Sequence, residues 1–118
     1  MLIETPNIYN YPYKDCNLYS YYVDNIFIGS FLLEEFNNYY IIWKFKINDP
    51  YKNQKYGSKM LEELISTFKK DIYLYVIYDN EIAIKLYKKF NFIENDDKIE
   101  NIIIPNKNLN LIKFKLKI

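Results

Sequence analysis

Hydrophobic and polar residues in the first half of the chain follow a pattern that is typical of short strands joined by tight turns. Branched and aromatic residues gather in three runs, and Asn or Asp residues separate these runs. Runs bounded in this way predict an antiparallel meander. The expected strands are 19–23, 26–33 and 39–48, with turns at 24–25 and 37–38.

The third of these strands shows the clearest alternation. Its hydrophobic residues Trp43, Phe45 and Ile47 alternate with polar ones, which are Lys44, Lys46 and Asn48. Because successive side chains of a strand point to opposite faces, the pattern predicts that the three hydrophobic residues share one face. We expect the polar face to meet water or a ligand.

After Pro50 the apolar residues recur at the three- and four-residue intervals of a helix. We expect this helix to begin near Gly57 and to end at 69–70. Its apolar stripe consists of Met60, Leu61, Leu64, Ile65 and Phe68. The next run, 72–78, lacks clean alternation, as a strand buried on both faces would. Such a strand, helix, strand unit is parallel and right-handed, and it places a ligand site beyond the carboxyl ends of its strands, here at loop 49–56.

A second helix is expected to begin at Asn80, a good N-cap residue, and to end at Asn91. Its expected apolar face consists of Ile82, Ala83, Leu86, Tyr87 and Phe90. The tail 91–118 predicts two closing strands, the last of which alternates hydrophobic residues with lysines. The sequence therefore predicts a mixed α/β fold in a single domain, 1–118, since this is the length of one ordinary domain.

Composition excludes several classes of function. The 16 basic residues are all lysines and face 15 acidic ones, so the net charge of +1 gives no broad attraction to nucleic acid. One cysteine, Cys16, and no histidine make a metal site improbable. No apolar run reaches the ~18 residues of a membrane helix, and the first residues do not resemble a secretory signal. We therefore expect a cytoplasmic protein. The abundance of Ile, Asn, Lys and Tyr is typical of an AT-rich genome, such as that of a large virus or a parasite.

The loop before the first helix is a candidate anion site. The N–H groups and positive dipole end of a helix N-terminus suit a phosphate or pyrophosphate. Lys52, Lys55 and Lys59 add positive charge nearby. The alternative interpretation is an ordinary strand-to-helix turn with solvated lysines.

The segment 74–92 carries a more specific motif. Leu74, Val76, Asn80, Ala83, Leu86, Tyr87 and Phe92 match, in register, a strand ending in L-x-V followed by N-x-x-A-x-x-L-Y-x-x-x-G-F. With this motif the chain resembles the GNAT superfamily of N-acetyltransferases. Only the glycine is replaced, by Asn91, which is the commonest other residue in the left-handed conformation that ends helices.

The loop departs further from the family pattern. Members of the family show (R/Q)-x-x-G-x-(G/A), and here Lys52, Lys55 and Gly57 occupy these positions. Lys52 keeps the charge of arginine. Lys55 places a side chain where the backbone approaches the pyrophosphate, so weaker binding of the cofactor is one expected consequence.

The resemblance implies a GNAT fold that binds acetyl-coenzyme A as co-substrate and transfers its acetyl group to an amine by direct attack. Pantetheine would lie between the splayed fourth and fifth strands, against the backbone near Phe45 and Ile47. The residue implied to protonate the departing thiolate is Tyr87. The residues implied to bind the cofactor are Phe45, Ile47, Lys52, Asn53, Gln54, Lys55, Tyr56, Gly57, Ser58 and Asn80. Asn80 as a simple helix cap, and Tyr87 as core packing, remain the alternatives.

Several points stay open in the sequence. Candidates for the general base are Glu34, Glu35, Asp49 or a chain of water molecules, whereas Cys16 is expected to be an idle thiol. The stretch before the first meander strand is too short for the two helices that wall the acceptor site in the family. An open site indicates a protein amine as acceptor, a partner subunit such as a second copy, or lost activity. A GNAT-like binding module without catalysis, or a small interaction protein without a cofactor, is the alternative function.

Overall fold

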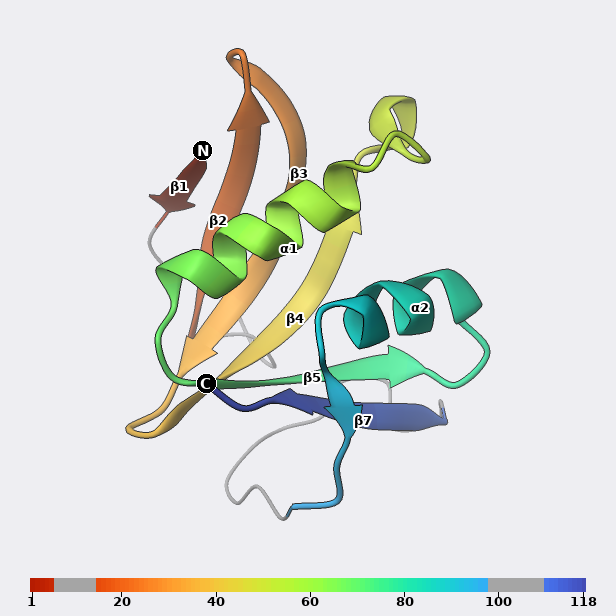
Figure 1. Ribbon diagram of the computed structural model, residues 1–118. Coiled ribbons are helices and arrows are strands. Elements are labelled where there is room, and N and C mark those ends of the chain that lie inside the picture. Colours follow the sequence, from red (N-terminus) through yellow and green to blue (C-terminus); the bar gives the residue numbers. More distant parts are fainter. Residues whose placement is uncertain (6–14, 98–109) are drawn as a thin grey trace.

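The computed structural model describes residues 1–5, 15–97 and 110–118, which form a seven-stranded mixed sheet with two α-helices. The strand order is β1-β2-β3-β4-β5-β7-β6. In chain order the elements are β1 (Leu2–Thr5), β2 (Cys16–Val23), β3 (Ile26–Glu35), β4 (Tyr39–Ile47), a 3-10 turn (Asp49–Tyr51), α1 (Tyr56–Thr67), β5 (Asp71–Ile77), α2 (Glu81–Lys89), β6 (Ile93–Glu94) and β7 (Leu111–Leu116). Both helices lie on the same face of the sheet (Figure 1).

The predicted meander is confirmed, because β2, β3 and β4 pair in antiparallel order. The β2–β3 turn holds Asp24 and Asn25 at positive φ, 50° and 66°, which these two residue types tolerate better than most. The predicted parallel unit is confirmed as well, since β4 and β5 pair in parallel and α1 connects them. Strand β1, which pairs with β2, was not predicted. Its four residues are too few to show a period.

The predicted closing strands correspond to β6 and β7, which pair with each other, and β7 also pairs with β5. Part of the predicted tail, 98–109, lies outside the described residues, as does most of the N-terminal stretch judged too short for two helices. Asn91 adopts φ 71° directly after α2. Its N–H donates to the Lys88 carbonyl and that of Phe92 to the Tyr87 carbonyl, so asparagine ends the helix as glycine would.

The predicted common face for Trp43, Phe45 and Ile47 is wrong. The step from Ser30 to Leu32 covers two residues of β3, whereas the matching step from Lys46 to Trp43 covers three residues of β4, so β4 carries an extra residue. This β-bulge is centred on Lys44, which has φ 51°. Phe45 and Ile47 pack toward the helices, while Trp43 is buried in a separate cluster on the opposite face.

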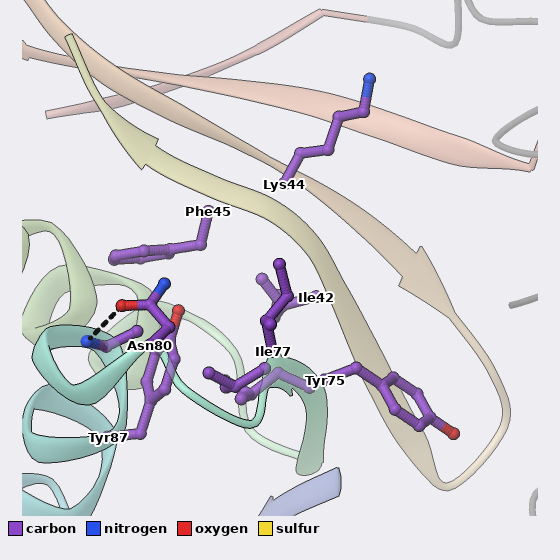
Figure 2. A pocket seen from close by; sticks show the side chains of 10 residues that line it. Ile42, Lys44, Phe45, Tyr75, Ile77, Asn80 and Tyr87 are labelled. Atoms are coloured by element: carbon purple, nitrogen blue, oxygen red, sulfur yellow. Dashed lines mark hydrogen bonds between the residues drawn. The ribbon is translucent and has the colours of Figure 1, made fainter. Parts of the chain in front are cut away.

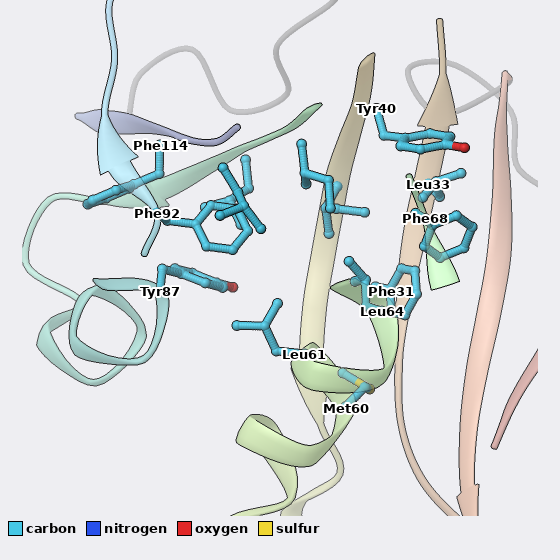
Figure 3. Close-up of a cluster of buried hydrophobic side chains, with 14 of the residues drawn as sticks. Phe31, Leu33, Tyr40, Met60, Leu61, Leu64, Phe68, Tyr87, Phe92 and Phe114 are labelled. Carbon is cyan, nitrogen blue, oxygen red and sulfur yellow. The ribbon is translucent and has the colours of Figure 1, made fainter. Parts of the chain in front are cut away.

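The main core lies between the sheet and the two helices. Met60, Leu61 and Leu64 of α1 are buried, which confirms the predicted stripe, and Phe68 directly after the helix is buried too. Figure 3 shows Phe31, Leu64 and Phe68 packed together on one side of this core and Tyr87, Phe92 and Phe114 on the other. On α2 the prediction is wrong for Ile82, because this residue is 79% exposed. Ile84 packs against the core instead.

Candidate functional site

Strands β4 and β5 form an incomplete pair. Tyr39–Ile42 of β4 pair with Asp71–Leu74 of β5, and the pairing stops there within the described chain. Beyond that point β4 continues alongside β3, from the bulge to Ile47, while β5 continues alongside β7 to Ile77. The two strand edges therefore separate and leave a wedge-shaped gap in the middle of the sheet, as Figure 2 shows from close by.

The gap holds a cavity of about 200 Å³. Its walls come from three elements and the turn before α2: Ile42, Lys44 and Phe45 of β4, residues 74–77 of β5, and Asn80, Ala83 and Tyr87 (Figure 2). Binding pockets for whole cofactors commonly span ~300–1,000 Å³, so this cavity suits one arm of a larger ligand. Apolar side chains line it together with polar groups of Lys44, Asn80 and Tyr87 at fixed positions, as in many ligand sites.

Asn80 is both a helix cap and a wall of the cavity. Its Oδ1 accepts a hydrogen bond from the Ala83 N–H at 3.2 Å, which is the N-cap interaction of α2. The Asn80 amide nitrogen has no hydrogen bond in the part of the chain that the structure describes. The same side chain can therefore cap the helix and still donate to a ligand in the gap.

Tyr87 combines core packing with access to the cavity. Its ring makes edge contacts with Phe45 and Phe92, at centroid distances of 5.9 and 5.7 Å, and only 6% of the residue is exposed. Figure 2 shows the side chain extending from α2 toward Phe45 and Asn80, with the hydroxyl at its far end. Burial raises the pKa of this phenol above its ordinary value, so the hydroxyl keeps its proton at neutral pH.

The loop between β4 and α1 presents a helix N-terminus without a side-chain cap. Lys55 occupies the N-cap position in the left-handed conformation, with φ 67° and ψ 12°, and its side chain makes no capping hydrogen bond. The N–H groups of Tyr56, Gly57 and Ser58 form the first helical turn, where a helix offers no backbone acceptors. The left-handed conformation explains why glycine suits position 55.

Side chains of the same loop are partly tied to each other. Lys52 forms an ion pair with Asp49 at 2.8 Å, which holds the pKa of that exposed carboxyl below its usual range. Gln54 Nε2 donates to the Pro50 carbonyl at 3.0 Å. Asn53 adopts φ 63°, a second left-handed residue that helps to fold the loop into a compact turn.

The start of α1, which follows the loop, lies next to the end of β4. A Cβ added at Gly57 would lie 3.9 Å from Ile47 Cγ1 and 3.5 Å from Leu86 Cδ2, so the start of α1 contacts the end of β4. Phe45, Asn80 and Tyr87, three of the predicted site residues, line the cavity itself. Ile47 ends β4 and packs against the main core, and the remaining predicted residues, 52–58, follow it in the loop and the first turn of α1. Three predicted residues thus lie at the cavity, and the others lie at the end of β4, in the loop and at the start of α1.

Among the cavity residues that were not predicted as site residues, two carry polar groups, Lys44 and Tyr75. Lys44 forms the bulge, and lysine at positive φ gives no warning in a sequence. Tyr75 belongs to a strand predicted to be buried on both faces, where no single tyrosine stands out among the 14 of the chain.

None of the carboxylates considered as a base lines the cavity. Glu35 pairs with Lys70 at 2.8 Å, Asp49 pairs with Lys52, and Glu34 accepts a hydrogen bond from Trp43. Cys16 is buried, and burial together with the charges of Glu34 and Asp15 raises the pKa of its thiol to about 12. It is therefore not a nucleophile at neutral pH.

Among the described residues no helix has the length and apolar character needed to cross a membrane.

Comparison with solved structures places this fold among acetyltransferases. A GNAT family acetyltransferase from Elizabethkingia anophelis with acetyl-CoA bound superposes with a TM-score of 0.75 at 17% identity, over 100% of this chain and 97% of the other. The ribosomal-protein-S18-alanine N-acetyltransferase from Escherichia coli gives 0.70 at 18% identity, over 88% and 70%. Mutant forms of the spermidine/spermine N-acetyltransferase from Vibrio cholerae give 0.65 at 17% identity, over 87% and 67%.

These identities are low, so the superpositions show the fold alone. Among curated proteins no relative matches the chain. The sequence profile of the Acetyltransferase (GNAT) family, however, matches residues 3–92, which is most of the chain. The chain therefore belongs to the GNAT family of acetyltransferases.

Proposed function

We propose that this protein is an N-acetyltransferase that moves the acetyl group of acetyl-coenzyme A to an amine by direct attack in a ternary complex. The observation that carries the proposal is the gap between β4 and β5, which Asn80 and Tyr87 line, together with the uncapped N-terminus of α1 that follows β4. Membership of the family and the acetyl-CoA bound to the Elizabethkingia anophelis neighbour support the same co-substrate.

The gap suits the extended pantetheine arm. Amides of such an arm can bond to an exposed strand edge as an added strand would, here along Phe45 and Ile47. The N–H groups of residues 56–58 and the positive end of α1 suit the pyrophosphate, with Lys52 contributing charge. Asn53, Gln54 and Lys55 would bind through the backbone of the turn that they form, and Asn80 through its amide nitrogen.

In the proposed reaction the neutral amine nitrogen attacks the thioester carbonyl carbon, so that a C–N bond forms and the C–S bond breaks. Coenzyme A leaves as the thiolate, and the Tyr87 hydroxyl donates to its sulfur. A thiol has a pKa near ~8.5, below that of this buried phenol, so Tyr87 acts mainly by stabilising the developing charge on sulfur through its hydrogen bond. The phenolate that is left after the proton moves to sulfur is reprotonated by water. The acceptor enters as an ammonium ion, which loses one proton before the attack and a second one after the C–N bond has formed. Both protons pass to water, since no carboxylate of the described chain lines the cavity.

The acceptor is an amine. Solved neighbours act, by their names, on spermidine or spermine and on an alanine of a ribosomal protein, so the fold serves both small and macromolecular amines.

Two assays test the proposal in sequence. Coenzyme A at one hundred times its dissociation constant should stabilise the fold by about 2.7 kcal/mol, which a domain of this size shows as a rise of several degrees in Tm. Release of coenzyme A from acetyl-CoA is then measured with a panel of amines, and at least one should give turnover above hydrolysis. No shift in Tm with either coenzyme A or acetyl-CoA would reject the cofactor site itself.

A second candidate is a module that binds acyl-CoA without catalysis. It is favoured by the position of Lys55, where the family has glycine, and by the lack of a carboxylate in the described walls of the cavity. Binding of acetyl-CoA without turnover on a broad panel of amines would establish this candidate in place of the enzyme.

A further inference from the structure

The gap between β4 and β5 narrows to a closed end. Ile42 of β4 and Leu74 of β5 form the last residue pair of the two strands, and both line the cavity. Only 3% of Ile42 and 2% of Leu74 is exposed, and both belong to the main core on the helix side of the sheet. Figure 2 shows the Ile42 side chain extending from β4 into the gap. We call the end of the cavity at these two residues the apex.

The walls beside the apex are apolar as well. Val76 follows Leu74 on the same face of β5, lines the cavity and is buried. From β4, Phe45 lines the cavity beyond the bulge, and its ring makes an edge contact with the ring of Tyr87. Protein interiors are packed so closely that a change of one methylene in volume is felt. The apex therefore suits a small alkyl group and has little tolerance for a larger one.

The proposed position of the coenzyme directs its acyl group to the apex. The first turn of α1, which would bind the pyrophosphate, follows the carboxyl end of β4. From there the pantetheine arm would run back along β4, past Ile47 and Phe45, to place its sulfur at the Tyr87 hydroxyl. Ile42 is the next residue of β4 that belongs to the core on the helix side. An acyl group on this sulfur thus lies between Tyr87 and the apex.

We propose that the apex limits the length of the acyl group, so that Ile42 and Leu74 make the enzyme selective for acetyl over longer acyl thioesters of coenzyme A. This inference rests on the acetyl transfer proposed above, and the bonds formed and broken are the same. The acetyl methyl group fills the space in front of the apex. Each further methylene has to displace buried side chains of the main core. One methylene in a hydrophobic pocket changes kcat/KM by ~10–200-fold, which sets the expected effect.

Binding of the thioesters tests the proposal without an acceptor. Calorimetry compares coenzyme A with acetyl-, propionyl- and butyryl-coenzyme A. We expect propionyl-coenzyme A to bind about tenfold or more weakly than acetyl-coenzyme A, and butyryl-coenzyme A to bind more weakly still. An affinity that is independent of acyl length, or that increases with it, overturns the proposal.

Substitutions that remove a single methylene identify the residues responsible. Ile42→Val and Leu74→Val each make room at the apex for the one methylene that propionyl adds, so each should bring the affinity for propionyl-coenzyme A close to that for acetyl-coenzyme A. Ile28→Val is the matched control, because Ile28 is buried in the same core on β3 and does not line the cavity. It should keep the wild-type order, and Tm checks that all three variants fold. Wild-type order in both apex variants would contradict the proposal.

Turnover gives a second readout, with any amine that the acceptor panel identifies. In wild type, kcat/KM for propionyl-coenzyme A should be about tenfold or more below that for acetyl-coenzyme A, and Ile42→Val should narrow this ratio. If acetyl-coenzyme A binds without turnover, the order of affinities still decides the inference. If coenzyme A binds but acyl length has no effect, this inference alone is rejected. If neither coenzyme A nor acetyl-coenzyme A binds, the proposed function fails at its first step, and the inference fails with it.

Discussion

Tyr87 has two environments at once: its ring is enclosed by Phe45 and Phe92, and its hydroxyl reaches the cavity. Tyr87→Phe removes the hydroxyl and keeps the ring, so folding and affinity for coenzyme A should change little. General acid or hydrogen-bond assistance contributes ~10²–10⁴-fold, and a thiolate is a good leaving group, so we expect kcat to fall by about 10²-fold. The measurement is coenzyme A release with an accepted amine, with Tm as the folding control. Unchanged turnover in a well-folded variant would assign Tyr87 to core packing alone.

Lys55 adopts the left-handed conformation at the N-cap of α1. Glycine adopts the left-handed conformation more easily than lysine does, so Lys55→Gly removes backbone strain at this position. It also removes a side chain beside the first-turn N–H groups, and one exposed charge is lost. We expect affinity for coenzyme A, measured by calorimetry, to be kept or increased. A loss of about tenfold or more, equal to ~1.4 kcal/mol, would mean that the Lys55 ammonium itself binds phosphate.

Asn80 caps α2 and lines the cavity, and two substitutions separate these roles. Asn80→Ser keeps a capping oxygen and should cost only a few tenths of a kcal/mol, whereas Asn80→Ala should cost about 1 kcal/mol of unfolding free energy. If the amide nitrogen contacts the ligand, both variants should bind coenzyme A more weakly than wild type. Wild-type affinity in Asn80→Ser would leave this residue as a cap only. Denaturant unfolding and calorimetry provide the two readouts.

At the level of the elements, the bulge in β4 lies where the gap opens. Gly29 of β3 pairs with Ile47 at the end of β4. A Cβ at Gly29 would lie 2.5 Å from the Lys46 carbonyl oxygen and 2.9 Å from Ile47 Cδ1. Gly29→Ala must therefore displace β4, which should lower the unfolding free energy by about 1–3 kcal/mol and raise KM for acetyl-CoA. Gly57→Ala is the matched control for stability, because its Cβ would make only ordinary contacts. Equal stability of the two variants would show that β4 tolerates the displacement.

Periodicity predicted most elements because their hydrophobic faces are simple. The helices α1 and α2, the meander and the parallel pair of β4 and β5 all followed from apolar spacing and from turn residues. The prediction that Trp43 shares a face with Phe45 and Ile47 was wrong. A single inserted residue turns the side chains on its two sides to opposite faces of the strand, and a lysine in the sequence does not indicate a β-bulge. The prediction that Ile82 belongs to the buried face of α2 was wrong as well, since hydrophobic residues can lie on an exposed helix face in a chain this rich in isoleucine.

The candidate site was predictable only in part. Asn80 and Tyr87 were found because the motif at 74–92 matches the family pattern in register, and both belong to one local element, α2 and its N-cap. Lys44 and Tyr75 come from two different strands, and their arrangement depends on register and on the bulge, which no local pattern encodes. The sequence could name several carboxylates as candidate bases, but only the tertiary structure shows that none of them lines the cavity.

For the whole molecule, the central claim is that one continuous path, from the first turn of α1 along the inner edge of β4 to Tyr87, binds an acyl-CoA. Backbone amide chemical shifts and hydrogen exchange, followed by NMR with and without coenzyme A, test this claim most directly. The account predicts shifts and slower exchange at residues 45–47 and 56–58, and perturbation of the Asn80 side-chain amide, with little change at β1 and β2. Saturating coenzyme A that leaves residues 45–47 and 56–58 unperturbed, or that acts only elsewhere in the sheet, would contradict it.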